Sequence, residues 1–209
     1  MLSINDYTGR TMKTSIQPFE MKNLPLIVDV VEPLWCPPVG DKDFKRFNVE
    51  YIVRNNIFEN DYHFQLVDET SDNEILSAAF FARKNDISTA DKWFSRESIR
   101  FPENLKIASQ MSKTYLNKMD ELTHSLMNDD DIMLSLFISR KPGSGSIIFE
   151  QTCQQMKNEG WKNLYLYTDC DCNWKWYTKH NFTLVQENIY EPFSSENEDY
   201  KTFIFRKEL

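Results

Sequence analysis

The sequence predicts a single α/β domain, and three observations support this prediction. An unbroken apolar run at 132–138, followed by a Gly-rich loop and a helical pattern, is typical of a buried strand leading into a helix. Two strand patterns at 62–68 and 74–84 flank a turn-forming segment and favour a β-hairpin. Two more strand patterns follow at 182–190 and 200–206. The sheet should therefore contain both parallel and antiparallel pairs.

The composition limits the possible classes of protein. The chain has 209 residues, 41% of them hydrophobic, which is enough for one domain with a buried core. Its formal net charge of −8, without a basic stripe, argues against nucleic acid as the main partner. An acidic surface suits a cationic amine substrate.

The cysteines and the absence of long apolar segments bear on location. Cys170-Asp171-Cys172 resembles a metal motif, but no second pair stands at zinc spacing, so no metal site is expected. Four cysteines without a disulfide-like framework fit a reducing compartment. No leader or membrane-length segment is evident, and we expect a cytoplasmic protein that does not enter a membrane.

The remaining elements follow from periodicity and from breaking residues. Residues 1–13 are polar and expected to be loosely structured, and a first strand is predicted at 14–19. Amphipathic helices are predicted at 23–35, 41–57, 88–100 and 105–127, the last two being separated by Phe101-Pro102.

The loop after the apolar run has the chemistry of an anion site. Gly143 and Gly145 allow close approach of the backbone to a ligand, and a helix start adds unpaired N–H donors and a positive dipole end. Arg140 and Lys141 add charge. A nucleotide-hydrolase loop would need Lys-Ser/Thr after its second glycine, and the dinucleotide fingerprint would need glycine where Ile148 stands. The turn could also bind no ligand at all.

Two motifs together resemble the GNAT superfamily of N-acetyltransferases. The stretch from Arg140 to Gly145 has the Arg-x-x-Gly-x-Gly pattern of that family's acyl-CoA pyrophosphate loop. About 30 residues later, Tyr177, Lys179 and Phe182 match Tyr-x-Lys-x-Gly-Phe, with Asn181 in place of glycine. Asparagine tolerates the left-handed conformation, so this departure is mild. The resemblance covers 132–209 well, and before that it depends on pattern alone.

The resemblance implies a fold and an activity. The fold would be a GNAT-like central mixed, mostly antiparallel, twisted sheet flanked by helices, in one domain over 1–209 with a helical insertion at about 86–129. The activity would be transfer of an acetyl group from acetyl-CoA, as co-substrate, directly to a primary amine of a small molecule or an amino terminus. The insertion could pack on the sheet, form a dimer contact or act as a lid over the acceptor.

The resemblance also assigns roles to residues. Tyr177 would protonate the leaving thiolate, and the backbone N–H of Phe137 or Ile138 would stabilise the oxyanion. The residues expected to bind acetyl-CoA are Phe137, Ile138, Arg140, Lys141, Pro142, Gly143, Ser144, Gly145, Ser146, Asn173 and Tyr177. The general base is open among Glu32, Asp41 and Asp131. The alternative function is a non-catalytic acyl-CoA sensor or interaction domain on the same fold, and a homodimer is possible for either.

Overall fold

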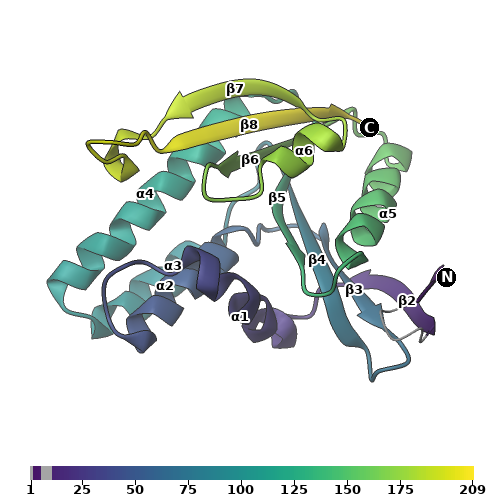
Figure 1. The fold of residues 1–209 in the computed structure, drawn as a ribbon, viewed down its shortest axis with the longest axis horizontal. Helices are drawn as coiled ribbons and strands as arrows, with labels where there is room; N and C mark the ends of the chain where they lie inside the picture. The colour runs from purple at the N-terminus through teal and green to yellow at the C-terminus, as the bar shows by residue number, and fades with distance from the viewer. Residues whose placement is uncertain (1, 6–10) are drawn as a thin grey trace.

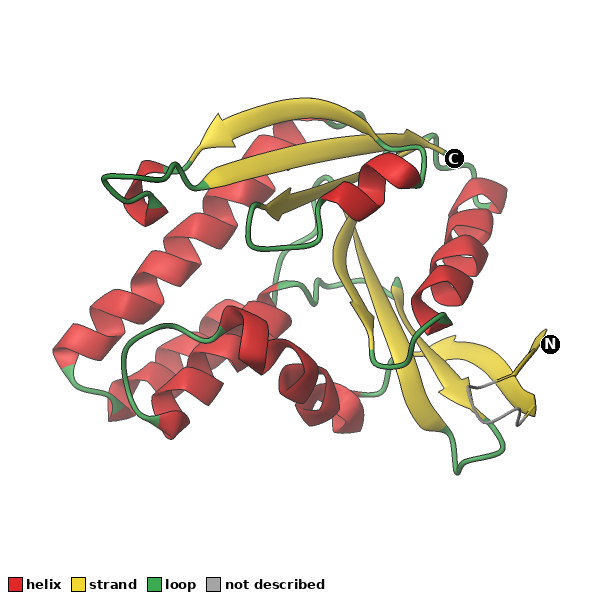
Figure 2. Cartoon of the chain, viewed as in Figure 1, coloured by secondary structure: helices red, strands yellow, loops and turns green. Residues whose placement is uncertain are grey.

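The computed structural model describes residues 2–5 and 11–209. The described strands form one eight-stranded sheet in the order β1-β2-β3-β4-β5-β6-β8-β7. Helix α5 packs on one side of this sheet, and helices α1 to α4 lie on the other (Figures 1 and 2). The predicted mixed, mostly antiparallel sheet is confirmed, because β5 and β6 form its one parallel pair among the described strands.

The amino-terminal part of the sheet is an antiparallel meander. Its strands are β1 (Leu2–Asn5), β2 (Thr11–Pro18), β3 (His63–Asp68), β4 (Glu74–Arg83) and β5 (Ile132–Ser139). The β3–β4 hairpin is confirmed, and its turn places Asp72 and Asn73 at φ of 51° and 56°. The expected loose start is wrong where β1 and β2 form, since backbone pairing orders even a polar segment; residues 1 and 6–10 lie outside the described residues.

The helices before β5 are close to the predicted positions. They are η1 (Met21–Asn23), α1 (Leu24–Trp35), α2 (Lys42–Asn55), α3 (Ala90–Glu97), η2 (Ser98–Arg100) and α4 (Glu103–Leu126). Pro102 precedes α4 in an extended conformation, which explains the break before that helix. Both α3 and α4 lie within 86–129.

The carboxyl-terminal part contains the second half of the sheet. Its elements are α5 (Ser144–Asn158), β6 (Asn163–Asp169), α6 (Lys175–Lys179), β7 (Thr183–Ile189), η3 (Glu191–Phe193) and β8 (Lys201–Glu208). Asn181 has φ of 64°, so it adopts the left-handed conformation expected at this position. Among the described residues, no helix is both long and apolar enough to cross a bilayer.

The sheet separates the apolar core into layers. Ile132, Leu134 and Ile148 belong to a cluster beneath α5, whereas Met133 packs with α2, α3 and α4. Leu136 belongs to a third cluster with α1 and α2. Strand β5 is therefore buried on both faces, as its unbroken apolar run predicts.

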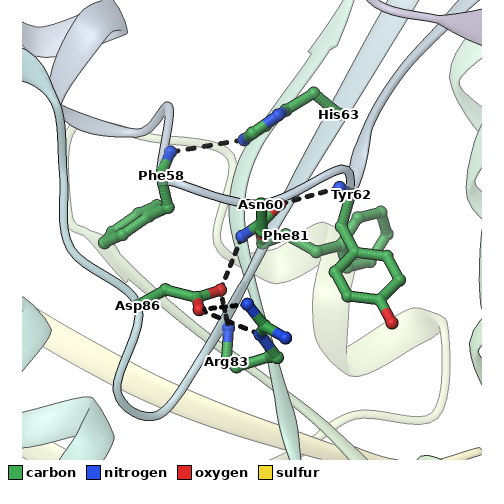
Figure 3. A network of polar contacts seen from close by, with 7 residues as sticks. All are labelled: Phe58, Asn60, Tyr62, His63, Phe81, Arg83 and Asp86. Atoms are coloured by element: carbon green, nitrogen blue, oxygen red, sulfur yellow. Dashed lines mark hydrogen bonds and ion pairs between the residues drawn. The ribbon is translucent and has the colours of Figure 1, made fainter.

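A polar network closes the end of the sheet where β5 begins (Figure 3). Asp86 accepts hydrogen bonds from Asn60 Nδ2 at 2.6 Å and from Arg83 Nε at 2.9 Å. Arg83 pairs with Ile132 at the start of β5. These side chains are engaged with one another, so the network fixes the loops at the end of the sheet opposite the Gly-rich loop.

Candidate active site

Strands β5 and β6 separate soon after they begin. Only two residue pairs join them, Ile132 with Leu164 and Met133 with Tyr165. Farther along, β5 continues beside β4 while β6 continues beside β8, and the two strands diverge (Figure 1). The carboxyl-terminal parts of both strands therefore face each other without pairing, and their backbone groups need other partners.

A β-bulge lies in β5 just beyond the point of separation. Phe80 opposes Leu136 and Phe81 opposes Leu134, which leaves Ser135 as the extra residue. The hydroxyl of Ser135 donates to the Asn56 carbonyl at 2.9 Å. Bulges often redirect the backbone beside active sites.

The strand register decides which backbone groups of β5 face the gap. The N–H of Arg140 donates to the Leu76 carbonyl on β4 at 2.8 Å. Because backbone groups alternate sides along a strand, those of Ile138 also face β4, whereas those of Phe137 face the opposite edge. Of the two residues predicted to stabilise an oxyanion, Phe137 has the N–H on the side where β6 has separated.

The charged residues of the Gly-rich loop lean toward the β3–β4 hairpin. The Arg140 side chain donates from Nη1 to the Ile75 carbonyl at 2.6 Å. Lys141 Nζ lies 3.5 Å from Glu74 Oε1, and Lys141 and Pro142 are exposed. Both cations remain beside the loop.

The first turn of α5 is anchored firmly to the sheet. Buried Ser144 donates from Oγ to the Leu76 carbonyl at 2.9 Å and to the Lys141 carbonyl at 2.7 Å. Its N–H also donates to Lys141, at 3.1 Å. A Cβ at Gly145 would lie 3.2 Å from Phe137 Cζ, so glycine allows the helix to approach β5 closely.

The start of α5 is not capped by its own residues. Gly143 stands at the N-cap with φ of 83° and no side-chain hydrogen bond, and Ser146 is exposed. The positive end of the α5 dipole therefore lies at the loop. Ser144 uses its N–H internally, so Gly145 and Ser146 are left as the donors of this turn.

Tyr177 lies on α6 among aromatic rings. Its ring centroid is 5.4 Å from that of Phe182 and 5.7 Å from that of Phe205. Burial, with smaller contributions from Cys172 and Asp169, raises the pKa of the Tyr177 hydroxyl above its usual value. The phenol therefore retains its proton at neutral pH. Asn173 is exposed, and its carbonyl accepts the N–H of Trp176 at 3.0 Å in the turn before α6.

The acidic residues considered as bases have structural partners. Glu32 accepts from Arg46 at 2.9 Å, and Asp41 caps α2. Asp131 is fully buried and accepts from Asn163 Nδ2 at 2.6 Å, at the start of β5 rather than at the gap. None of the three is brought to the place where β5 and β6 separate.

The sequence analysis missed two carboxylates near β6. Asp169, at the end of this strand, accepts a hydrogen bond from Tyr115 Oη at 3.1 Å. Asp120 of α4 accepts from Asn55 Nδ2 at 3.3 Å. Asp120 lies one position after Met119 on the apolar stripe of α4, and a carboxylate beside such a stripe was the available signal. Among the described residues, no group of three or more His, Cys, Asp or Glu side chains could hold a metal ion.

Comparisons with known proteins identify the fold. No protein-family model matches the sequence, and no curated protein matches it significantly. The ribosomal-protein-S18-alanine N-acetyltransferase from Escherichia coli aligns over 94% of both chains, with 12% identity and a TM-score of 0.53. Arylalkylamine N-acetyltransferase 2 from Aedes aegypti aligns over 94% of this chain and 99% of its own, with 10% identity and a TM-score of 0.50.

A third solved structure of similar fold is the C-terminal condensation domain of Ebony in complex with beta-alanyl-dopamine. It aligns over 95% of this chain and 100% of its own, with 9% identity and a TM-score of 0.57. These identities are low, and the likeness is one of architecture. The chain has the fold of the GNAT superfamily of N-acetyltransferases.

Proposed function

We propose that the protein transfers an acetyl group from acetyl-CoA directly to a primary amine of a small molecule or an amino terminus. The observation that carries this proposal is the early separation of β5 and β6 beside a Gly-rich loop and an uncapped helix start. This arrangement offers backbone hydrogen-bonding groups to an extended amide-containing arm and donors to a pyrophosphate.

The residues of the loop suit the pyrophosphate. Gly145 and Ser146 offer N–H groups at the positive end of α5, and Arg140 and Lys141 supply charge beside them. Pro142 and Gly143 shape the turn that presents these donors. We assign the pantetheine arm to the edge of β5 at Phe137 and Ile138, with Asn173 on the facing side.

The reaction requires three catalytic roles: stabilisation of the oxyanion, protonation of the leaving thiolate and deprotonation of the amine. The N–H of Phe137 stabilises the oxyanion that forms when the amine attacks the thioester carbonyl. Tyr177 protonates the leaving thiolate, whose intrinsic pKa is about 8.5. The amine must lose a proton first, because an alkyl ammonium has a pKa of about 10.4. We expect the reaction to take place in the cytoplasm.

A calorimetric titration with acetyl-CoA tests the cofactor site. Gly145→Glu places bulk and negative charge at the proposed pyrophosphate site. Two like charges about 4 Å apart near a protein surface repel by about 4 kcal/mol, so we expect about a thousandfold weaker binding. Gln154→Glu adds the same charge on an exposed face of α5 and should leave the affinity unchanged.

An amine screen then tests turnover. Tyramine, agmatine and a peptide with an amino-terminal alanine would each be incubated with acetyl-CoA, and thiol release would be followed. Binding of acetyl-CoA with turnover of an amine supports the enzyme. Binding without turnover of any amine would favour the sensor, and absence of binding would contradict both functions.

A further inference from the structure

Two polar atoms between α4 and β6 lack hydrogen-bond partners in the described part of the chain. They are Oδ1 of Asp120 and the hydroxyl oxygen of Tyr167, and both are buried. Burial and the nearby charge of Asp120 raise the pKa of Tyr167 well above its usual value, which places the two groups close together. Buried polar atoms normally have partners, so these two atoms indicate a place that a ligand or water completes.

The position of this pair links it to the proposed active site. Tyr167 stands two residues beyond Tyr165, the last residue of β6 that pairs with β5. Asn55, which holds the other oxygen of Asp120, precedes Asn56, whose carbonyl binds the bulged Ser135. The carboxylate therefore lies beside the point where β5 and β6 separate, on the side of α2 and α4.

We propose that Asp120 is the general base that takes a proton from the acceptor amine, and that Tyr167 is a positioning residue for its carboxylate. This inference rests on the proposed acetyl transfer. The observations that carry it are the unpartnered Oδ1, the adjacent unpartnered hydroxyl and their place at the bulge of β5.

The step balances in protons and electrons. The ammonium transfers one proton to Asp120, and the nitrogen lone pair then forms the C–N bond to the acetyl carbonyl carbon. The C–S bond breaks with its electron pair on sulfur, and the thiolate takes a proton from Tyr177. The second proton of the nitrogen is released as the amide forms and restores Tyr177, while Asp120 loses its proton to solvent.

The surroundings of Asp120 suit this role at neutral pH. Burial raises its pKa to about 7, opposed by the hydrogen bond from Asn55 and by the nearby polar hydroxyl of Tyr167, and the charge of Glu121 raises it further. Tyr51 of α2 also faces the carboxylate, and its own pKa is raised chiefly by burial. A base whose pKa is near the working pH is efficient, because it is ionised and can still hold the proton it accepts.

The test is the pH dependence of kcat/KM with the first amine of the panel that turns over. In the wild type, we expect kcat/KM to fall tenfold per pH unit below about pH 7. Asp120→Asn should lower kcat/KM at pH 8 by on the order of 100-fold to 10,000-fold and move the acid limb from about pH 7 toward the pKa of the amine, about 10.4, because the variant can use only the free amine. Binding of acetyl-CoA should be unchanged. Glu103→Gln, an exposed carboxylate in the first turn of the same helix, should keep both the rate and the limb.

Tyr167→Phe gives a second readout that a merely structural role would not produce. Its hydroxyl favours the charged form of Asp120, so its loss should raise the pKa of Asp120 and move the acid limb to higher pH.

The outcomes distinguish failure of this inference from failure of the proposed acetyltransferase function. An active wild type whose Asp120→Asn variant keeps the rate and the acid limb would overturn the role of Asp120 and leave the acetyltransferase intact. A wild type that binds acetyl-CoA but acetylates no amine would overturn both. If the acid limb of Tyr167→Phe lay at the same pH as that of the wild type, Tyr167 would not be a positioning residue for Asp120.

Discussion

The two sides of the gap between β5 and β6 are built differently. On the α5 side, the buried hydroxyl of Ser144 bonds two carbonyls, and the turn is held by backbone and short side chains. On the α4 side, Asp120 Oδ1 and the Tyr167 hydroxyl are buried without partners. The first side leaves backbone N–H groups open at the start of α5, whereas the second leaves buried side-chain atoms open.

In the proposed function, this difference assigns binding of acetyl-CoA to the α5 side and deprotonation of the amine to the α4 side. A group common to all reactions, such as a pyrophosphate, can be held by rigid backbone donors. An acceptor must be deprotonated as well as bound, which requires titratable side chains in a shielded place. The predictions below test whether the two sides differ in this way, from the largest expected effect to the smallest.

Tyr177→Phe removes the proposed proton donor and keeps the ring that packs on Phe182 and Phe205. We expect kcat to fall on the order of 100-fold with acetyl-CoA affinity unchanged, measured by thiol release and by calorimetry. Tyr190→Phe, which removes another buried phenol, should have little effect on kcat. If Tyr177→Phe retained the wild-type rate and pH profile, the assignment of the acid would be wrong.

Ser144→Ala tests how completely the α5 side is satisfied. The substitution removes the buried hydroxyl that bonds the Leu76 and Lys141 carbonyls, although each carbonyl keeps a backbone N–H donor, so we expect the free energy of unfolding to fall by about 1.5 kcal/mol. Urea denaturation measures it. Ser146→Ala changes an exposed serine and should stay within about 0.5 kcal/mol of the wild type. Equal losses for both variants would contradict the anchoring role of Ser144.

Asp120→Asn tests the open α4 side through stability. Because burial raises the pKa of Asp120 from 3.8 to about 7, the folded state binds more protons than the unfolded state between these values. The stability of the wild type should therefore fall as pH rises through this window, and level off above it. One pKa unit corresponds to about 1.4 kcal/mol. Allowing for partial exposure, we expect the variant to be more stable by about 1.5 kcal/mol at pH 8 and not at pH 4.

Asp41→Ala separates a structural carboxylate from a catalytic one. Asp41 Oδ1 accepts the N–H of Phe44 at 2.9 Å and caps α2, so its loss should lower the free energy of unfolding by about 1 kcal/mol. Thermal unfolding measures this. The pH profile of turnover should not change. An altered acid limb in this variant would return Asp41 to the candidates for the base.

The α5 side of the gap could be predicted because its parts are contiguous in the sequence. One stretch from Ile132 to Ser146 contains the strand, the loop and the helix start, and their local sequence preferences agree with the structure. The departure of Asn181 from the expected glycine was also readable, since its left-handed φ follows from local chemistry.

The α4 side of the gap could not be predicted, because it is assembled from segments that lie far apart in the sequence. Asn55, Asp120 and Tyr167 lie on α2, α4 and β6, and each alone looks like an ordinary helix or strand residue. Their meeting depends on how α4 packs between α2 and β6, which local patterns do not encode. The early separation of β5 and β6 could not be predicted either, since nothing in the unbroken apolar run at 132–138 marks where the pairing of β5 with β6 ends.

The short seam between β5 and β6 also has a consequence for motion. Seven residue pairs join β4 to β5 and seven join β6 to β8, but two pairs alone join the two halves of the sheet directly. A molecule lying along both strands would bridge the halves and slow amide hydrogen exchange at Phe137 and in the second half of β6. Such a ligand at 100 times its Kd adds about 2.7 kcal/mol to the free energy of unfolding, so occupancy could be followed by a rise in Tm.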